Sequence, residues 1–205
     1  THAGISVGED GATHQCNEDI ALMRTIPGMV ILNPSDDIEA KAAVKAAYEH
    51  EGPVYMRFGR LAVPIINDRP DYKFEIGKGV TLREGKDVAI IATGLCVSES
   101  LAAAEKLAAD GIDAKVINIH TIKPLDEDLV VAAAKECGKV VTVEEHSVIG
   151  GLGSAVCETL SRKAPTPVKN IGVQDCFGES GPAVALLEKY GLNAEGIYAS
   201  VKEFV

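Results

Sequence analysis

Short apolar runs alternate along the chain with longer segments whose apolar residues recur at helical spacing. In the first third of the sequence, glycine and proline stand between these segments, where a helix or strand has to end. Strands that alternate with helices predict a parallel α/β sheet. The elements expected here are an opening strand around residues 5–7, helices over residues 17–25 and 38–50, and strands over residues 29–32 and 54–58.

The same alternation resumes after a break. Residues 61–73 have no helical or strand period and carry two prolines, so we expect them to link two domains. The sequence therefore predicts a part-domain over residues 1–60, this linker, and a doubly wound α/β domain over residues 74–205, with helices on both faces of its sheet. The strands expected there cover residues 74–82, 88–92, 114–119, 139–143 and 168–173, and the helices residues 98–110, 124–136, 154–163, 182–190 and 193–205.

The amino-acid composition restricts the possible functions of the protein more than its possible folds. Hydrophobic residues make up 46% of the 205, enough for a core, but aromatic residues only 4%, which argues against a surface that stacks bases or sugars. The formal net charge of -10 offers no basic footprint for nucleic acid, although a few local cations can still bind a phosphorylated substrate. No apolar stretch approaches about 18 residues, so we expect no membrane partner.

The five cysteines are odd in number, widely spaced and without a CxxC pair. This pattern favours reduced thiols over a disulfide framework or a zinc site. We therefore expect a cytoplasmic protein.

Residues 2–15, HAGISVGEDGATHQ, hold the densest group of reactive side chains in the sequence. Because ligands collect at the carboxyl ends of strands in open α/β sheets, we expect a loop on which Asp10 and His14 converge on one ligand. His14 can relay protons near neutral pH, and Asp10 can accept a hydrogen bond from a substrate hydroxyl. A plain surface turn is one alternative. A metal site of His2, Glu9, Asp10 and His14 is another, but their spacing matches no standard zinc pattern.

Two arginines, Arg57 and Arg60, lie near the end of the strand expected over residues 54–58. In a parallel sheet this strand end faces the same edge as the GEDGATHQ loop, where an arginine can bind a phosphate group bidentately. Arg60 follows the strand and is the candidate phosphate ligand. Arg57 lies inside the strand and is expected to be structural.

A glycine-rich segment, GGLGS at residues 150–154, follows a strand and opens a helix. It is not a full GxGxxG, and close helix–strand packing explains it at least as well as a phosphate site does. Glu144, Glu145 and His146, just before it, are interpreted as ordinary polar residues at a strand end. The remaining candidates, His50, His120 and Cys16, are interpreted as structural.

Together these residues resemble the transketolase family of thiamine-diphosphate enzymes. The resemblance covers essentially the whole chain, and GEDGxTHQ is a specific motif. The C-terminal motifs are shared more widely, with 1-deoxyxylulose-5-phosphate synthase and with 2-oxoacid dehydrogenase β subunits. Glu9 favours transketolase, whereas RFGR and the chain's ending lean towards the synthase. The segments that carry the resemblance are TH, GEDGATHQ, MVILNPSD, GPVYMRFGR, IATG, KPLDEDLV, VVTVEEHSVIGGLGS and YGLNAEGIYASVKEF.

The resemblance implies a role for each of four residues. His14 would be the catalytic residue over the reactive carbon of the cofactor, and Asp10 would bind a substrate hydroxyl. His2 and Arg60 would bind the phosphate of the sugar substrate. The implied reaction transfers a two-carbon ketol unit from a ketose phosphate to an aldose phosphate with thiamine diphosphate. The implied fold is the latter half of a pyrimidine-binding domain, with a parallel sheet, followed by a doubly wound transketolase C-terminal domain.

The sequence also departs from the family. Family members bind the diphosphate and its Mg²⁺ or Ca²⁺ through a GDG-type motif on a separate N-terminal domain, and this motif does not occur here. Their activating glutamate and stacking aromatics would precede Thr1. We therefore expect part of a longer enzyme or the C-terminal subunit of a split one, inactive alone, acting with an N-terminal diphosphate-binding domain or subunit and forming a homodimer. Part of a 1-deoxyxylulose-5-phosphate synthase and a non-catalytic α/β assembly module stay open as alternatives.

Overall fold

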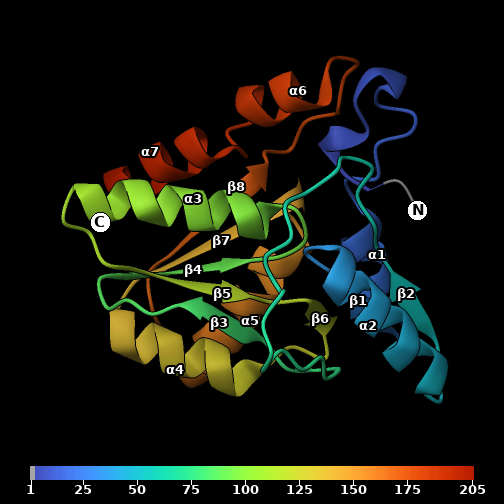
Figure 1. Cartoon of the computed structure of the whole chain (residues 1–205), viewed down its shortest axis with the longest axis horizontal. Helices are drawn as coiled ribbons and strands as arrows, with labels where there is room; N and C mark the ends of the chain where they lie inside the picture. The colour runs from blue at the N-terminus through green and yellow to red at the C-terminus, as the bar shows by residue number, and fades with distance from the viewer. Residues whose placement is uncertain (1–2) are drawn as a thin grey trace.

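A five-stranded sheet forms the centre of the protein (Figure 1). The structure is a computed structural model, and it describes residues 3–205. Four strands of the sheet are parallel, which confirms the predicted α/β fold, and the edge strand β3 is antiparallel to its neighbour β5. The strands, in the spatial order β3-β5-β4-β7-β8, are β3 (Val80–Arg83), β5 (Ala114–Asn118), β4 (Val88–Ala92), β7 (Val140–Ser147) and β8 (Val168–Val173).

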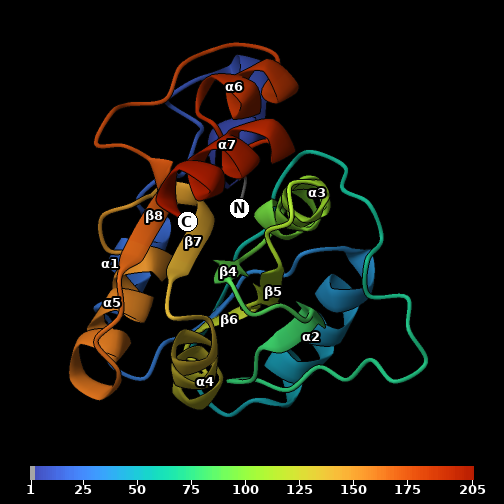
Figure 2. The same ribbon diagram turned by 90° about the vertical axis from the view of Figure 1, so that its left-hand side faces the viewer.

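Helices cover both faces of this sheet (Figures 1 and 2). Helices α3 (Cys96–Ala109), α6 (Ala183–Lys189) and α7 (Ala194–Phe204) pack on one face, and α4 (Glu127–Cys137) and α5 (Leu152–Lys163) on the other. Alternate residues of β4 belong to the two hydrophobic cores on either side. This explains why β4 is a continuous apolar run, since a central parallel strand is buried on both faces. None of the helices in the described range is both long and apolar enough to cross a bilayer.

A second, three-stranded sheet lies beside the first, in the order β2-β1-β6. Strands β1 (Val30–Leu32) and β2 (Val54–Met56) pair in parallel, with helices α1 (Asp19–Arg24) and α2 (Asp37–Glu49) preceding and following β1. The third strand, β6 (Thr121–Lys123), comes from the later part of the chain and pairs with β1 in the antiparallel sense. The sequence pattern did not predict β6, because its three residues are too few to show a period.

The opening strand expected around Ile5 and Val7 is wrong. Residues Ile5–Asp10 form 3₁₀ turns, labelled η1, which are interrupted at Gly8. Gly4, Gly8 and Gly11 have φ angles of 75°, 83° and 76°, a region that other residues rarely adopt. The positive φ angles of these three glycines turn the backbone and prevent an extended strand. Ile5 and Val7 are nevertheless buried, so their apolar pattern reports burial and not a strand.

The predicted helices are present, and some of them start at a side-chain cap. Asn193 caps α7 by accepting the N–H of Gly196. Asn17 does not cap α1, which begins after Glu18 without a side-chain cap. Gly138 ends α4 in the left-handed conformation, with a φ of 70°.

Residues 61–73 form neither a helix nor a strand, yet they are fixed to the start of α2. Asp36 caps α2 by accepting the N–H of Glu39, and it also accepts the N–H groups of Ile66 and Asn67. Burial works to raise the pKa of Asp36, but these hydrogen bonds lower it below its ordinary value. The carboxylate of Asp36 therefore stabilises the start of α2 and also fixes residues 61–73 to it.

Candidate functional site

Residues 3–16, which contain GEDGATHQ and are called the GEDGATHQ loop below, form a closed loop with a buried neck and an exposed tip. Its two ends meet where Ala3 and Cys16 form an isolated β-bridge. Residues 3–8 are buried, whereas Glu9, Asp10 and residues 12–14 are exposed. The side chains that can do chemistry therefore lie on the part of the loop that faces solvent.

The structure brings together two of the predicted site residues, Asp10 and Arg60. Nη1 of Arg60 donates to Oδ2 of Asp10 and lies 3.4 Å from the carbonyl oxygen of Val7. The loop and the segment after β2 therefore do meet, although Ile5–Asp10 form 3₁₀ turns in place of the expected strand. The two side chains are 46% and 40% exposed. Because an exposed ion pair contributes only about 0–1 kcal/mol, a solute anion can compete with Asp10 for Arg60.

The structure does not join His14 to these two residues directly. His14 is exposed at the loop tip, and its Nδ1 lies 2.9 Å from Oγ1 of Thr13. In the part of the chain that the structure describes, no recorded hydrogen bond or ion pair connects His14 with Asp10 or Arg60. The convergence of Asp10 and His14 on one ligand stays a prediction. His2, the other predicted phosphate ligand, lies outside the described residues.

Arg57 follows β2 and is buried, as its predicted structural role requires. Its Nε donates to Oδ2 of Asp19 at 2.9 Å, and its Nη2 donates to the carbonyls of Cys16 at 3.0 Å and of Glu145 at 2.8 Å. Burial works to lower the pKa of Arg57, but Asp19 and Glu145 raise it above its ordinary value. Arg57 therefore stays charged and ties the end of the loop to β7.

The interpretation of Glu144, Glu145 and His146 as ordinary polar residues at a strand end is wrong. They lie inside β7 and are 0%, 3% and 0% exposed. Burial raises the pKa of both glutamates to about 7 and lowers the pKa of His146 to about 4. A signal for the longer strand was present, because no glycine or proline follows the apolar run before Gly150.

The glycine-rich segment at the start of α5 binds the carboxyl group of Glu144, a side chain of the protein itself. The backbone N–H groups of Leu152 and Gly153 donate to the two carboxylate oxygens of Glu144, at 2.7 and 2.8 Å. The N-terminus of a helix favours a negative charge, and Glu144 provides it here. A Cβ on Gly151 would collide with Glu144, and one on Gly153 would crowd Thr142, so close packing against β7 requires these two glycines.

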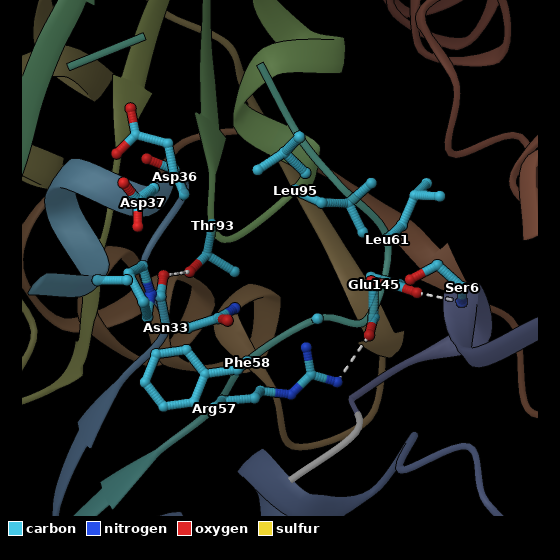
Figure 3. Close-up of a pocket in the computed structure, with 15 residues that line it drawn as sticks. Ser6, Asn33, Asp36, Asp37, Arg57, Phe58, Leu61, Thr93, Leu95 and Glu145 are labelled. Atoms are coloured by element: carbon cyan, nitrogen blue, oxygen red, sulfur yellow. Dashed lines mark hydrogen bonds between the residues drawn. The ribbon is translucent and has the colours of Figure 1, made fainter. Parts of the chain in front are cut away.

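A cavity of about 160 Å³ lies beside the neck of the loop. Figure 3 shows Arg57 at its border reaching the backbone carbonyl of Glu145, whose side chain turns towards Ser6, and it shows Asn33 and Thr93 on the opposite side. The cavity is not lined by the predicted site residues of the described chain, Asp10, His14 and Arg60. These residues therefore lie outside it, and the exposed tip of the loop is the candidate site.

Comparison with known protein families identifies the family to which the chain with this loop belongs. The family profile described as the transketolase pyrimidine binding domain matches residues 1–65, and that of the transketolase C-terminal domain matches residues 77–197. The chain belongs to the transketolase family. The loop with Asp10 and His14 lies in the first matched region, and Glu144 and Glu145 lie in the second.

Two transketolase relatives match nearly the whole chain. A 6-deoxy-6-sulfo-D-fructose transketolase subunit of Clostridium sp. strain MSTE9 is 47% identical over 200 residues, 98% of this chain and 62% of the relative. A protein of Methanocaldococcus jannaschii described as a transketolase C-terminal section is 47% identical over 205 residues, 99% of this chain and 64% of the relative. The chain thus spans less than two thirds of the length of these relatives.

The likeness extends to a solved transketolase and to a second kind of enzyme. A split gene transketolase, described as an inactive β4 tetramer, is similar with a TM-score of 0.90 and 51% identity over 98% of this chain and 64% of that one. The 1-deoxy-D-xylulose-5-phosphate synthase 1 of Geobacter sulfurreducens is 41% identical over 207 residues, 98% of this chain and 32% of the relative.

Transketolases depend on thiamine diphosphate, whose diphosphate needs backbone N–H donors or cations and whose divalent metal needs oxygen ligands. The N-terminus of α5 is taken by Glu144. Across residues 3–205, no three His, Cys, Asp or Glu side chains are grouped so that they could hold a metal ion.

Proposed function

We propose that this chain is the C-terminal part of a transketolase that transfers a two-carbon ketol unit from a ketose phosphate to an aldose phosphate. The observation that carries the proposal is the meeting of Asp10 and Arg60 at the exposed tip of the loop that also holds His14. A carboxylate, a guanidinium and an imidazole on one exposed surface suit a substrate with hydroxyl groups and an anionic end.

Each residue has a distinct role in this proposal. Arg60 leaves Asp10 and binds the phosphate of the sugar bidentately, together with His2. Asp10, once released, accepts a hydrogen bond from a substrate hydroxyl. His14 is the catalytic residue and moves a proton to or from the substrate oxygen at the reacting carbon. The sulfonated sugar in the name of the Clostridium relative supports a site that binds an anionic end group in general.

The proposal includes a partner that supplies the cofactor site. Relatives named as a subunit and as a C-terminal section, and the split gene structure, support a complex with an N-terminal subunit or domain. That partner would bind thiamine diphosphate with Mg²⁺ or Ca²⁺, in a homodimer of the whole unit. We further propose that residues 1–60 complete a pyrimidine-binding domain, residues 61–73 link it, and residues 74–205 form the C-terminal domain.

The test combines the chain with an N-terminal section that carries the diphosphate-binding domain. Ketol transfer from a ketose phosphate is expected from the mixture and not from the chain alone. Replacement of the catalytic residue, His14→Ala, is expected to lower kcat roughly 10²- to 10⁴-fold. The control His50→Ala removes a histidine from the end of α2 and leaves kcat unchanged. An unchanged kcat in His14→Ala would leave the assembly module as the explanation.

A second candidate function is part of a 1-deoxyxylulose-5-phosphate synthase, which the 41% identity to the Geobacter sulfurreducens enzyme favours. The same mixture decides between them. Release of CO₂ from pyruvate in the presence of glyceraldehyde phosphate identifies a synthase, and transfer from a ketose phosphate without CO₂ release identifies a transketolase.

A further inference from the structure

The neck of the GEDGATHQ loop is held by two segments from the region that matches the transketolase C-terminal domain. From β7, the side chain of Glu145 accepts the N–H of Ser6. From the segment before α6, the carbonyl of Glu179 accepts a hydrogen bond from Nε2 of Gln15 at 2.8 Å. Figures 1 and 2 show α6 beside η1, and the two elements are in contact.

Glu145 contacts one end of the loop with its side chain and is linked to the other end through Arg57. Its side chain packs so closely against Gly4 that a Cβ at this position would collide with it. Its backbone carbonyl accepts a hydrogen bond from Arg57, which also donates to the carbonyl of Cys16 at the other end of the loop. Figure 3 shows the contacts of Glu145 with Ser6 and Arg57 as dashed lines. Because Glu145 is only 3% exposed, no solvent competes for these contacts.

The adjacent residue, Glu144, is just as buried but serves a different element. Successive side chains of a strand point to opposite faces of the sheet. Glu144 accordingly binds the first N–H groups of α5, while Glu145 binds the loop. One buried glutamate thus stabilises the C-terminal region itself, and its neighbour acts on the loop that carries the candidate site.

We propose that Glu145 is a positioning residue, which holds the neck of the loop so that the tip presents Asp10 and His14 in one geometry. Its side chain acts through Ser6 and Gly4 and does not touch the substrate. Geometry matters because a displacement of about 1 Å can lower a reaction rate roughly 100-fold. The kinetic part of this inference rests on the proposed function, and the structural part does not.

The structural part is tested on the chain by amide hydrogen exchange measured with NMR. Glu145→Met keeps a long unbranched side chain but removes the acceptor. It is expected to speed exchange at the Ser6 amide at least about 10-fold, because this donor loses its partner. Glu145→Gln keeps an acceptor oxygen and is expected to restore slow exchange. Glu144→Met is the matched control, and it is expected to speed exchange at Leu152 and Gly153 only.

The kinetic part is tested in the complex with the N-terminal section, below the melting temperature of each variant. Glu145→Met is expected to lower kcat roughly 10- to 100-fold with a smaller change in KM. Glu145→Gln is expected to restore kcat. Glu144→Met is expected to lower the melting temperature without changing kcat.

Three results would overturn the inference. The first is unchanged exchange at Ser6 in Glu145→Met. The second is equal loosening of the loop by Glu144→Met, which would indicate general destabilisation. The third is a loosened loop with an unchanged kcat. If the wild-type complex transfers no ketol unit, the proposed function fails, and the exchange experiment alone decides whether Glu145 holds the loop.

Discussion

Arg57 and Arg60 are three residues apart but differ in solvent exposure and in the groups that they bind. Arg57 is 2% exposed and makes three hydrogen bonds to protein groups. Arg60 is exposed, and its ion partner Asp10 is exposed too. A buried arginine with all its partners in place stabilises the fold, whereas an exposed one can exchange its partner for a ligand. The sequence predicted this difference, although Arg57 follows β2 and does not lie inside it.

The exposed arginine gives a kinetic prediction for the complex with the N-terminal section. Arg60→Gln is expected to raise KM for a phosphorylated substrate roughly 10- to 100-fold, because a charge-assisted hydrogen bond contributes about 1.5–3 kcal/mol. Arg60→Lys keeps the charge without the bidentate geometry and is expected to show a smaller rise. Steady-state kinetics measure both. An equal KM in all three proteins would remove Arg60 from the phosphate site.

Caps and turns decide where the helices and loops of this protein begin and end. Asp36 and Asn193 each accept a backbone N–H three residues further along the chain and so start α2 and α7, since a cap acts on the next three residues only. Asn17 is a residue of the same capping type but does not cap α1. The turns of η1 were missed because the effect of Gly4 and Gly8 depends on φ angles that composition does not reveal.

The two caps differ in how many groups they satisfy, which predicts unequal effects on stability. Asp36→Ala removes hydrogen bonds to three backbone N–H groups and is expected to lower the free energy of unfolding by about 2–4 kcal/mol. Asn193→Ala removes one such bond and is expected to cost about 1 kcal/mol. Urea unfolding measures both. Equal losses would mean that the contacts of Asp36 with Ile66 and Asn67 add nothing.

Two glycines with positive φ differ in both crowding and backbone conformation. A Cβ on Gly138, whose ψ is -10°, meets no atom within 4 Å, so Gly138→Ala is expected to cost only the left-handed penalty of about 1–2 kcal/mol. Gly11 has a ψ of -170°, a conformation open essentially to glycine alone, and a Cβ there would collide with Oγ of Ser180. Gly11→Ala is therefore expected to lower the free energy of unfolding further in the same urea experiment. An equal or smaller loss at Gly11 would show that the backbone of Gly11 and Ser180 adjust without added strain.

The protein as a whole buries three ionisable groups in β7, and their titration makes stability depend on pH. The pKa of Glu145 is raised by burial to about 7 in the folded state, so folding takes up a proton between about pH 4.5 and 7. The stability that this carboxyl contributes is therefore present below this window and is lost as pH rises through it. His146, with a pKa lowered to about 4, changes stability in the opposite direction.

Comparison with a variant isolates the glutamate from the histidine. The free energy of unfolding of the wild type relative to Glu145→Gln is expected to fall by on the order of 2–3 kcal/mol as pH rises from 5 to 7. Urea unfolding at several pH values measures this difference. A difference that does not change with pH would mean that Glu145 has the same pKa in the folded and unfolded states.

The local patterns of the sequence determined the α/β class, nearly every helix and most of the strands, because the period of apolar residues and the capping residues act over a few positions. The GEDGATHQ motif also identified the loop and the family.

Contacts between distant residues decided the rest. Strand β6 pairs with β1 across about ninety residues, and Glu145 reaches Ser6 across 139. A carboxylate that reads as solvent-exposed in the sequence became a buried support of the loop, since burial depends on which distant segments pack against a residue and not on its neighbours in the chain.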